Sequence, residues 1–380
     1  MIYLDNGATS FPKMPGMIDT MTNCMATYCG NPGRSGHYMS MRTGEEVYKA
    51  RKSLAKLFNI ANPGQIVFTS NTTTALNQGI QGILNKGDHV ITTAMEHNSV
   101  LRPLKALEEH GVTHTIVPCD KAGFVNIRDI KASIKENTKL IVCTHASNVT
   151  GTIMPIKEIG QLAHRNNILF MVDAAQSAGV LPINVVEMNI DLLAMPGHKG
   201  LLGPMGTGVL YISEGLELKP LFQGGTGTAS KDRNQPRDIP EGLEAGTGNA
   251  PGIIGLGYSV EKLMHIGVMY VRNYEEELTA LLDESLRNMK RITVYGPEDC
   301  SKKAGIVTFN IKDKSCEQVA DQLSENYGIC CRGGYQCAGL AHKTIGTWDT
   351  GAVRLSVGPF NTKKEIKIAI EAVYRTTQMP

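Results

Sequence analysis

The sequence predicts an α/β protein, with a large domain built on a mainly parallel seven-stranded sheet and a smaller α+β domain toward the C-terminus. Between residues 65 and 212, short β-branched apolar runs alternate with amphipathic stretches, which is typical of a parallel sheet with helices on both faces. A chain of 380 residues is also too long for one compact core and suits two domains. We expect the large domain to span residues 15–257 and the small domain to combine residues 1–14 with 258–380.

Seven apolar runs supply the predicted strands of the large domain, at residues 66–69, 89–92, 115–117, 140–143, 169–172, 192–194 and 209–212. Helices are expected between them, near residues 72–84, 97–110, 126–136 and 156–166. Residues 203–257 are rich in glycine and proline, which predicts a long loop region over a functional site. In the C-terminal part we expect one long helix at 258–290, strands at 306–309 and 352–357, and helices near 315–327 and 363–375.

The composition excludes several classes of protein. Charged residues make up 19% of the chain and the net charge is +2, so no field attracts nucleic acid or an anionic membrane. No apolar run approaches the roughly 20 residues of a membrane span, and the first residues lack a signal-peptide pattern, so we expect a cytoplasmic protein. The nine cysteines are scattered and lack the paired spacing of a zinc site, which predicts free thiols and no metal centre.

Two charged residues follow two successive apolar strands. Asp173 ends the run that begins at Leu169, and Lys199 follows the run at 192–194 within Gly-His-Lys. Ligands of open α/β sheets bind at the carboxyl ends of the strands, where both residues are expected. Each alone is ambiguous, because an aspartate at a strand end also serves as a cap or turn residue. Lys199 does not belong to a phosphate-binding loop, since Gly200 stands where that motif requires Ser or Thr.

Together with further motifs, this pair resembles the fold-type I enzymes that use pyridoxal 5'-phosphate (PLP), and in particular the class V aminotransferase and cysteine desulfurase family. The resemblance runs along nearly the whole chain and includes residues 3–9, 68–73, 95–98, 147–151, 244–247 and 332–337. It implies a fold-type I architecture, PLP as the cofactor, a small amino-acid substrate and a homodimer.

The resemblance gives a role to each residue near the expected cofactor ring. Lys199 would hold PLP as a Schiff base and move the substrate proton, which requires an amine whose charge is disfavoured. Asp173 would pair with the pyridine nitrogen and keep it protonated, so that the ring accepts electrons. Gln176 and Asn148 would donate hydrogen bonds to the phenolic oxygen. His97 would stack on the ring and assist proton movement.

The phosphate of the cofactor is expected at a helix N-terminus. Thr72 and Thr73 lie between a predicted strand and a predicted helix, where backbone N–H groups favour an anion, and a capping role is compatible with this position. By resemblance, His198 also contacts the phosphate, and Thr247 reaches the phosphate held by the neighbouring subunit. Pro196 stands where the family usually has a serine, which removes one hydroxyl from the phosphate site.

Arg354 lies in an apolar strand pattern, where a charge is costly to bury unless it is paired. A guanidinium matches a carboxylate with two hydrogen bonds, and the family uses the matching arginine for the carboxylate of the substrate. The alternative is an arginine on the solvated face of the strand. Arg332 and Asn148 complete the predicted substrate-binding residues.

Cys337 decides the expected reaction. Residues 332–338 resemble the compact active-site loop of one group of cysteine desulfurases, which implies conversion of L-cysteine to L-alanine with a persulfide on Cys337. Thiolate formation needs a nearby positive charge or base, and Arg332 is the first candidate and His342 a weaker one. Cys330 and Cys331 lie in an apolar run and are interpreted as core residues.

Other activities fit the same residues. A selenocysteine lyase would use nearly the same site, and a class V aminotransferase or other PLP amino-acid enzyme would leave Cys337 incidental. A non-enzymatic scaffold predicts loss of Lys199 or Asp173, yet both are present. A sulfur-acceptor protein is a further expected partner of a desulfurase.

Overall fold

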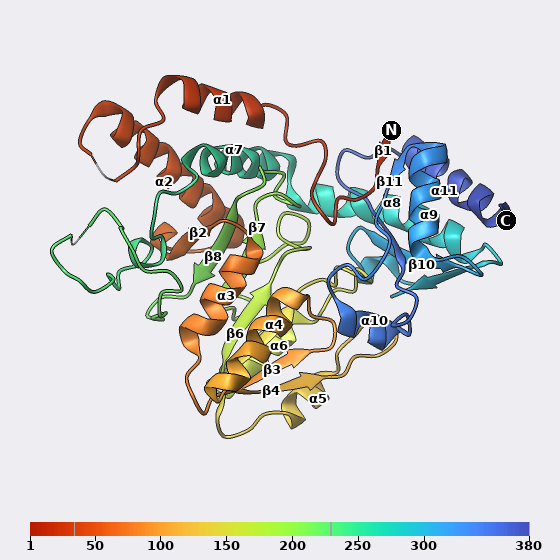
Figure 1. Ribbon diagram of the computed structural model, residues 1–380, viewed down its shortest axis with the longest axis horizontal. Helices are drawn as coiled ribbons and strands as arrows, with labels where there is room; N and C mark the ends of the chain where they lie inside the picture. The colour runs from red at the N-terminus through yellow and green to blue at the C-terminus, as the bar shows by residue number, and fades with distance from the viewer. Residues whose placement is uncertain (34, 229, 380) are drawn as a thin grey trace.

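The computed structural model describes residues 1–33, 35–228 and 230–379 and centres on a seven-stranded sheet (Figure 1). Its strand order is β2-β8-β7-β6-β5-β3-β4. The strands are β2 (Ile66–Thr69), β3 (His89–Thr93), β4 (Thr113–Val117), β5 (Thr138–Thr144), β6 (Leu169–Asp173), β7 (Leu192–Pro196) and β8 (Gly208–Ile212). Only β8 runs antiparallel to its neighbours, β2 and β7, among these strands. The predicted mainly parallel seven-stranded sheet is therefore confirmed.

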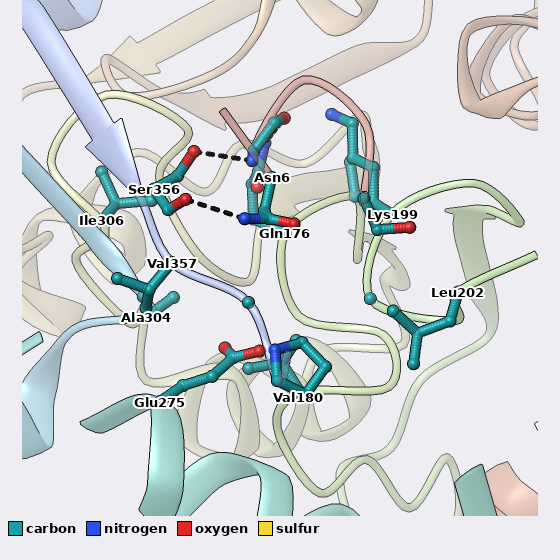
Figure 2. A pocket seen from close by; sticks show the side chains of 17 residues that line it. Asn6, Gln176, Val180, Lys199, Leu202, Glu275, Ala304, Ile306, Ser356 and Val357 are labelled. Carbon is teal, nitrogen blue, oxygen red and sulfur yellow. Dashed lines mark hydrogen bonds between the residues drawn. The ribbon is translucent and has the colours of Figure 1, made fainter. Parts of the chain in front are cut away.

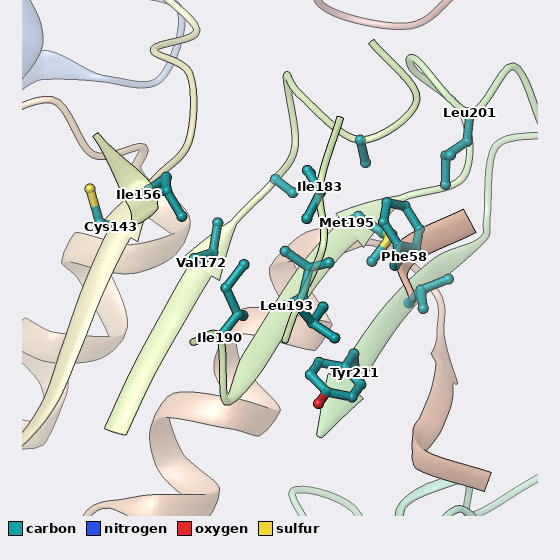
Figure 3. Packing of buried hydrophobic residues seen from close by; sticks show 14 of the residues in the cluster. Phe58, Cys143, Ile156, Val172, Ile183, Ile190, Leu193, Met195, Leu201 and Tyr211 are labelled. Atoms are coloured by element: carbon teal, nitrogen blue, oxygen red, sulfur yellow. The ribbon is translucent and has the colours of Figure 1, made fainter. Parts of the chain in front are cut away.

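Side chains alternate between two cores along the central strands, because successive residues of a strand point to opposite faces. In β7, Leu192 and Ala194 pack in the core on one face of the sheet, and Leu193 and Met195 pack in the core on the other face. Figure 3 shows Leu193 and Met195 near Phe58, from the end of a helix that covers this second face. The predicted cover of helices on both faces is confirmed.

Helices from several separate segments of the chain cover the two faces of the large sheet. α3 (Thr72–Ile83) and α4 (Asn98–Leu107) contribute to the first core, and α2 (Tyr38–Phe58), α6 (Ile156–Arg165) and α7 (Ala250–Ile266) contribute to the second. Two further helices complete this part, α1 (Met17–Thr27) and α5 (Ile127–Ala132). The last of these is shorter than the helix predicted at 126–136, and α1 and α2 had no counterpart among the predicted elements.

The C-terminal part has its own sheet and its own core. An antiparallel sheet of order β12-β10-β9 joins β9 (Ile292–Tyr295), β10 (Ile306–Ile311) and β12 (Val353–Ser356). Beside it, β1 (Ile2–Tyr3) pairs in parallel with β11 (Ile329–Cys330), so the start of the chain joins this part (Figure 1). Its helices are α8 (Val268–Arg287), α9 (Cys316–Tyr327), α10 (Gly339–Ile345) and α11 (Lys363–Gln378).

The single helix predicted at 258–290 is wrong. The structure has two helices, α7 and α8, which meet at Gly267, where φ is 92°. A left-handed backbone of this kind ends a helix and is adopted readily only by glycine. The loop region predicted at 203–257 is also too long, because it contains β8 and because α7 begins at Ala250, capped by the side chain of Asn249.

The two helices that meet at Gly267 pack in different cores. Val260 and Leu263 of α7 belong to the core of the large sheet, whereas Leu278 and Leu282 of α8 belong to the core of the C-terminal part. We therefore propose Gly267, rather than residue 257, as the boundary between the two domains. No helix of the described residues is long and apolar enough to cross a membrane.

The topology brings five strand ends to one edge of the large sheet. β3, β5, β6 and β7 are parallel, and β2 runs in the same direction because β8 is antiparallel to both β2 and β7. The loops after these five strands therefore meet at one edge, as expected for the ligand crevice of an α/β sheet.

The packing of α6 beneath the sheet can be tested at Gly160. A Cβ atom at this position would lie 1.9 Å from the carbonyl oxygen of Met188, so Gly160→Ala should destabilise the protein by about 2 kcal/mol. In the control Gly44→Ala, on α2, the nearest atom would be 3.8 Å away, and the substitution should stabilise by up to about 1 kcal/mol. Equilibrium unfolding in urea measures both. Equal midpoints for Gly160→Ala and the parent protein would contradict this packing.

Candidate active site

The five strand ends at the sheet edge surround a common cavity. The segments at the ends of β2, β3, β5, β6 and β7 contribute, in this order, Thr72 and Thr73, His97, Asn148, Asp173 and Gln176, and His198 and Lys199. The structure therefore brings together eight of the residues predicted for the cofactor. Pro196, the last residue of β7, is not among the lining residues.

Asp173 and Lys199 form the electrostatic centre of the cavity. The Asp173 side chain is 2% exposed, and one of its oxygens accepts a hydrogen bond from the Ala175 N–H at 2.9 Å. Burial raises the pKa of Asp173 to about 6, while the Ala175 N–H and the positive charge of Lys199 act in the opposite direction. Burial, and then the positive charge of Arg354, lowers the pKa of Lys199 to about 8. Both pKa shifts favour the neutral form of the side chain. For Lys199, the neutral form is the reactive amine.

The N-terminus of α3 forms one end of the cavity. The side chain of Asn71 caps this helix by accepting a hydrogen bond from the Thr74 N–H at 2.9 Å. The next two residues, Thr72 and Thr73, line the cavity, and both lie in the first turn of a helix, where backbone N–H groups lack helical partners. This end of the cavity suits a phosphate group.

His97 is held at the N-terminus of α4 with a defined protonation. Its Nδ1 accepts a hydrogen bond from the Ser99 N–H at 3.0 Å. Burial, and then the positive charge of Lys199, lowers the pKa of His97 to about 4. The neutral ring therefore carries its proton on Nε2. The Ser99 hydroxyl also lies 2.8 Å from that of Thr73, so one serine connects the histidine to the N-terminus of α3.

Residues from the start of the chain contact two of the residues that line the cavity, His198 and Gln176. Nδ1 of His198 lies 3.0 Å from the hydroxyl of Thr9, and the His198 carbonyl accepts a hydrogen bond from Lys13 Nζ at 2.8 Å. Burial, and then the positive charge of Lys199, lowers the pKa of His198 to about 4. Gln176 donates a hydrogen bond from its amide to the Gly7 carbonyl at 2.9 Å. One amide hydrogen of Gln176 is therefore used by the protein itself.

A second cavity lies on the other side of the Lys199 loop, between the two parts of the chain. Figure 2 shows Asn6, Gln176 and Lys199 in its lining, with Ser356 of β12 hydrogen-bonded to the 6–7 loop. Glu275 of α8 lines another part of it, and burial raises the pKa of this carboxyl to about 8. Lys199 and Gln176 therefore contribute to the walls of both cavities.

Arg354 is buried and paired, as its place in an apolar strand predicts. It is 1% exposed in β12, and its Nη2 donates to Asp5 Oδ1 at 2.8 Å. Its Nη1 donates to the Asn148 carbonyl at 3.0 Å, and its Nε has no partner among the described residues. The alternative of a solvated arginine is wrong, and Asp5 is a partner that the sequence did not indicate.

Cys337 is exposed, on the loop between β11 and α10. Nη2 of Arg332 lies 3.6 Å from its sulfur, so the predicted positive charge stands beside the thiol. The Cys337 carbonyl accepts a hydrogen bond from the Asn98 N–H at 2.9 Å, next to His97. The thiol therefore lies on a loop that is bound to the N-terminus of α4.

His342 does not serve as a base for Cys337. It is buried, and its two ring nitrogens lie 2.7 Å from the Thr347 hydroxyl and 2.8 Å from Gln336 Oε1. Burial lowers the pKa of His342 to about 4. The weaker candidate for thiol activation is therefore wrong. Thr247 is exposed in the single chain, outside the lining of the cavity.

The residues of the first cavity fit PLP. In the described part of the chain, the Lys199 amine makes no hydrogen bond or ion pair, and Asp173 has a single backbone donor for a buried carboxyl. Such a carboxyl requires a further partner, and a protonated pyridine nitrogen would supply one. The N-terminus of α3 would hold the phosphate.

Three participants in the site carried no clear sequence signal. Ser99 and Asp5 are ordinary polar residues whose partners, Thr73 and Arg354, lie far away in the sequence. Gln336 lies inside the motif at 332–337, yet only the structure shows that Asn148 Nδ2 donates to its carbonyl at 2.6 Å. The spacing of the motif gave Gln336 no role of its own.

Comparison with known proteins agrees with this geometry. The family described as aminotransferase class-V matches residues 2–368. A probable cysteine desulfurase of Methanothermobacter thermautotrophicus is 38% identical over 379 residues, covering 98% of this chain and 94% of that protein. The cysteine desulfurase IscS of Clostridium botulinum strain Hall is 35% identical, covering 98% of this chain and 93% of that protein.

Solved structures give the same result. The apo structure of a cysteine desulfurase from Thermococcus onnurineus has a TM-score of 0.93 at 32% identity, over 99% of this chain and 94% of that one. The cysteine desulfurase CsdA (S-sulfonic acid) from Escherichia coli has a TM-score of 0.89 at 28% identity, over the same shares. Sequence, fold and site geometry agree, and the chain belongs to the aminotransferase class-V family.

Proposed function

We propose that this protein is a PLP-dependent cysteine desulfurase that converts L-cysteine to L-alanine and leaves a persulfide on Cys337. The observation that carries the proposal is the place of this thiol. Cys337 is exposed, and its carbonyl is bound by Asn98, the residue after His97 of the cofactor cavity. The preceding carbonyl, of Gln336, is bound by Asn148, which lines the same cavity.

Lys199 and Asp173 hold the cofactor in this proposal. Lys199 binds PLP covalently through its amine, and Asp173 pairs with the pyridine nitrogen. Thr72, Thr73 and His198 bind the phosphate, and Asn148 and Gln176 face the phenolic oxygen. When bound, PLP accepts electrons from the α-carbon of the amino acid. Lys199, with a pKa near 8, takes and returns the α-proton, and His97 lies against the ring.

The substrate carboxylate is assigned to Arg354. Its Nε has no partner among the described residues, and the guanidinium lies in one group with Asp5 and Asn148. A carboxylate that replaces Asp5 on this guanidinium would form the usual two-bond pair. Arg332, beside Cys337, supplies a second positive charge for the substrate.

The sulfur step takes place on the Cys337 thiolate. Its sulfur attacks the sulfur of the bound cysteine, an S–S bond forms and the C–S bond of the substrate breaks. The electron pair of the C–S bond stays with the substrate carbon, which takes up a proton and becomes the methyl group of alanine. The sulfur is oxidised as the carbon is reduced, so the step needs no external oxidant. Nη2 of Arg332, 3.6 Å from the sulfur, places a positive charge beside the attacking atom.

A homodimer is part of the proposal. Thr247 is exposed and lies outside the cavity lining of its own chain, as expected if it reaches the phosphate of the neighbouring subunit. A thiol-bearing sulfur acceptor would then remove the persulfide sulfur from the exposed Cys337.

Replacement of the proposed sulfur carrier tests the reaction directly. Cys337→Ala should lower alanine and sulfide production from cysteine by at least about a thousandfold, because the nucleophile is lost. The cofactor absorbance should be unchanged. Cys300→Ala, which removes a thiol that lines neither cavity, is the matched control and should keep the parent rate. Undiminished alanine production by Cys337→Ala would contradict the proposal, and selenide production from selenocysteine would show whether the same site serves a lyase.

Cofactor capture by the cofactor-free protein tests the shifted pKa of Lys199. The neutral amine is the reactive form, and a pKa of about 8 makes its fraction rise with pH and level off near pH 9. The rate of PLP binding, followed by absorbance, should therefore increase about tenfold between pH 7 and pH 9, whereas an ordinary lysine would give about a hundredfold. Lys199→Ala should show no absorbance of the lysine-bound cofactor. A rate that still rises severalfold above pH 9 would contradict the buried amine.

A further inference from the structure

The loop that carries Cys337 has an unusual backbone. Gln336 and Cys337 both have positive φ angles, of 45° and 59°. For residues other than glycine, this left-handed conformation is strained and persists only where the surroundings impose it. A strained pair that includes the proposed nucleophile requires contacts that hold it in place.

The side chain of Gln336 provides such contacts. It is 1% exposed, and its Nε2 donates to the Ala352 carbonyl at 3.0 Å. Its Oε1 lies 2.8 Å from His342 Nε2. Because the amide nitrogen faces a carbonyl, Oε1 is the acceptor, and His342 Nε2 must carry the proton.

His342 is fixed in its turn. Its Nδ1 lies 2.7 Å from the Thr347 hydroxyl and accepts that hydrogen, since the ring proton is on Nε2. The low pKa of the buried ring, about 4, keeps it neutral in neutral solution. Thr347, His342, Gln336 and Ala352 therefore form one directed chain of donors and acceptors, in which every bond fixes the next.

The backbone of the strained pair is bound from the other side. Asn148 donates to the Gln336 carbonyl at 2.6 Å, and the Asn98 N–H donates to the Cys337 carbonyl at 2.9 Å. Asn148 lies on the loop after β5, and Asn98 is the first residue of α4. The side chain of Gln336 anchors the loop to the C-terminal part, and its backbone is bound to the wall of the cofactor cavity.

We infer that Gln336 is a positioning residue that sets the Cys337 thiol over the cofactor cavity, and that His342 holds Gln336 in place. The inference rests on the proposed desulfurase function. Neither side chain touches the thiol, and both act through the backbone of the strained pair. The sulfur carrier is therefore presented at a fixed place.

The test compares two pairs of variants in the PLP-loaded protein. Gln336→Ala removes the anchor, and Tyr335→Phe is its control on the same loop. The latter loses only the hydroxyl bond to the Trp348 carbonyl and keeps the ring contact with His342. His342→Leu removes the N–H group that donates to Gln336 Oε1. His342→Gln keeps a donor, because its side-chain amide carries N–H groups.

Four readouts separate positioning from loss of structure. We expect kcat for alanine production to fall about a hundredfold in Gln336→Ala and His342→Leu, as for a misplaced reacting group. The KM for cysteine should change less than about threefold, because the substrate contacts remain. The cofactor absorbance and the alkylation of Cys337, followed by mass spectrometry of its peptide, should persist. His342→Gln should recover most of the rate, and Tyr335→Phe should match the parent.

Two results would overturn the inference. One is a kcat of Gln336→Ala within about twofold of the parent. The other is a loss in His342→Leu that His342→Gln does not relieve, and this pair decides the matter if Gln336→Ala fails to fold. Cys337→Ala, measured in the same assay, distinguishes failure of the positioning role from failure of the proposed desulfurase function. If it is inactive while Gln336→Ala is active, only the positioning role is wrong, and if it produces alanine at the parent rate, the desulfurase function itself is wrong.

Discussion

The buried guanidinium of Arg354 is the constraint on which the arrangement of the site depends. It joins three segments that are far apart in the sequence, namely β12, the start of the chain through Asp5, and the loop after β5 through Asn148. A charge that is 1% exposed must always have an anionic partner, either Asp5 or the carboxylate of a bound substrate, because breaking a buried pair leaves an uncompensated charge. The C-terminal part is therefore held against the edge of the large sheet, where the Cys337 loop is hydrogen-bonded to Asn148, which lines the cofactor cavity, and to Asn98, which follows His97.

Within the cofactor cavity, burial shifts the pKa values of Asp173 and Lys199 in opposite directions. Burial raises the pKa of Asp173 and lowers that of Lys199, so each is held closer to its neutral form than in water. A cofactor with a protonated ring nitrogen and a reactive aldehyde would satisfy both groups at once. The helix N-terminus at Thr72 and Thr73 and the neutral His97 add a phosphate site and a flat ring. The proposed division of labour follows, with cofactor chemistry on the sheet and sulfur chemistry on the loop of Cys337.

The sequence was sufficient for the sheet and for most of the cavity. Short apolar runs predicted each strand of the large sheet. Asp173 and Lys199 were ambiguous from their places at strand ends alone, and the resemblance of the motifs gave them their roles. The break at Gly267 was not predicted, because apolar helical spacing continues on both sides of a single glycine. The pairs Arg354–Asp5 and Asn148–Gln336 were also missed, since they join residues 349 and 188 positions apart. His342 was a weaker candidate for activating the thiol, whereas α10 directs its ring toward Gln336.

The central claim is that Cys337 carries the sulfur of the substrate. Its most direct test is to mix the PLP-loaded protein with one equivalent of cysteine without reductant, trap all thiols, and map the cysteines by mass spectrometry. The account predicts one added sulfur atom on the peptide that contains Cys337, in proportion to the alanine formed, and none on the buried cysteines such as Cys143. Alanine formed in the same amount with no added sulfur on Cys337 would contradict it.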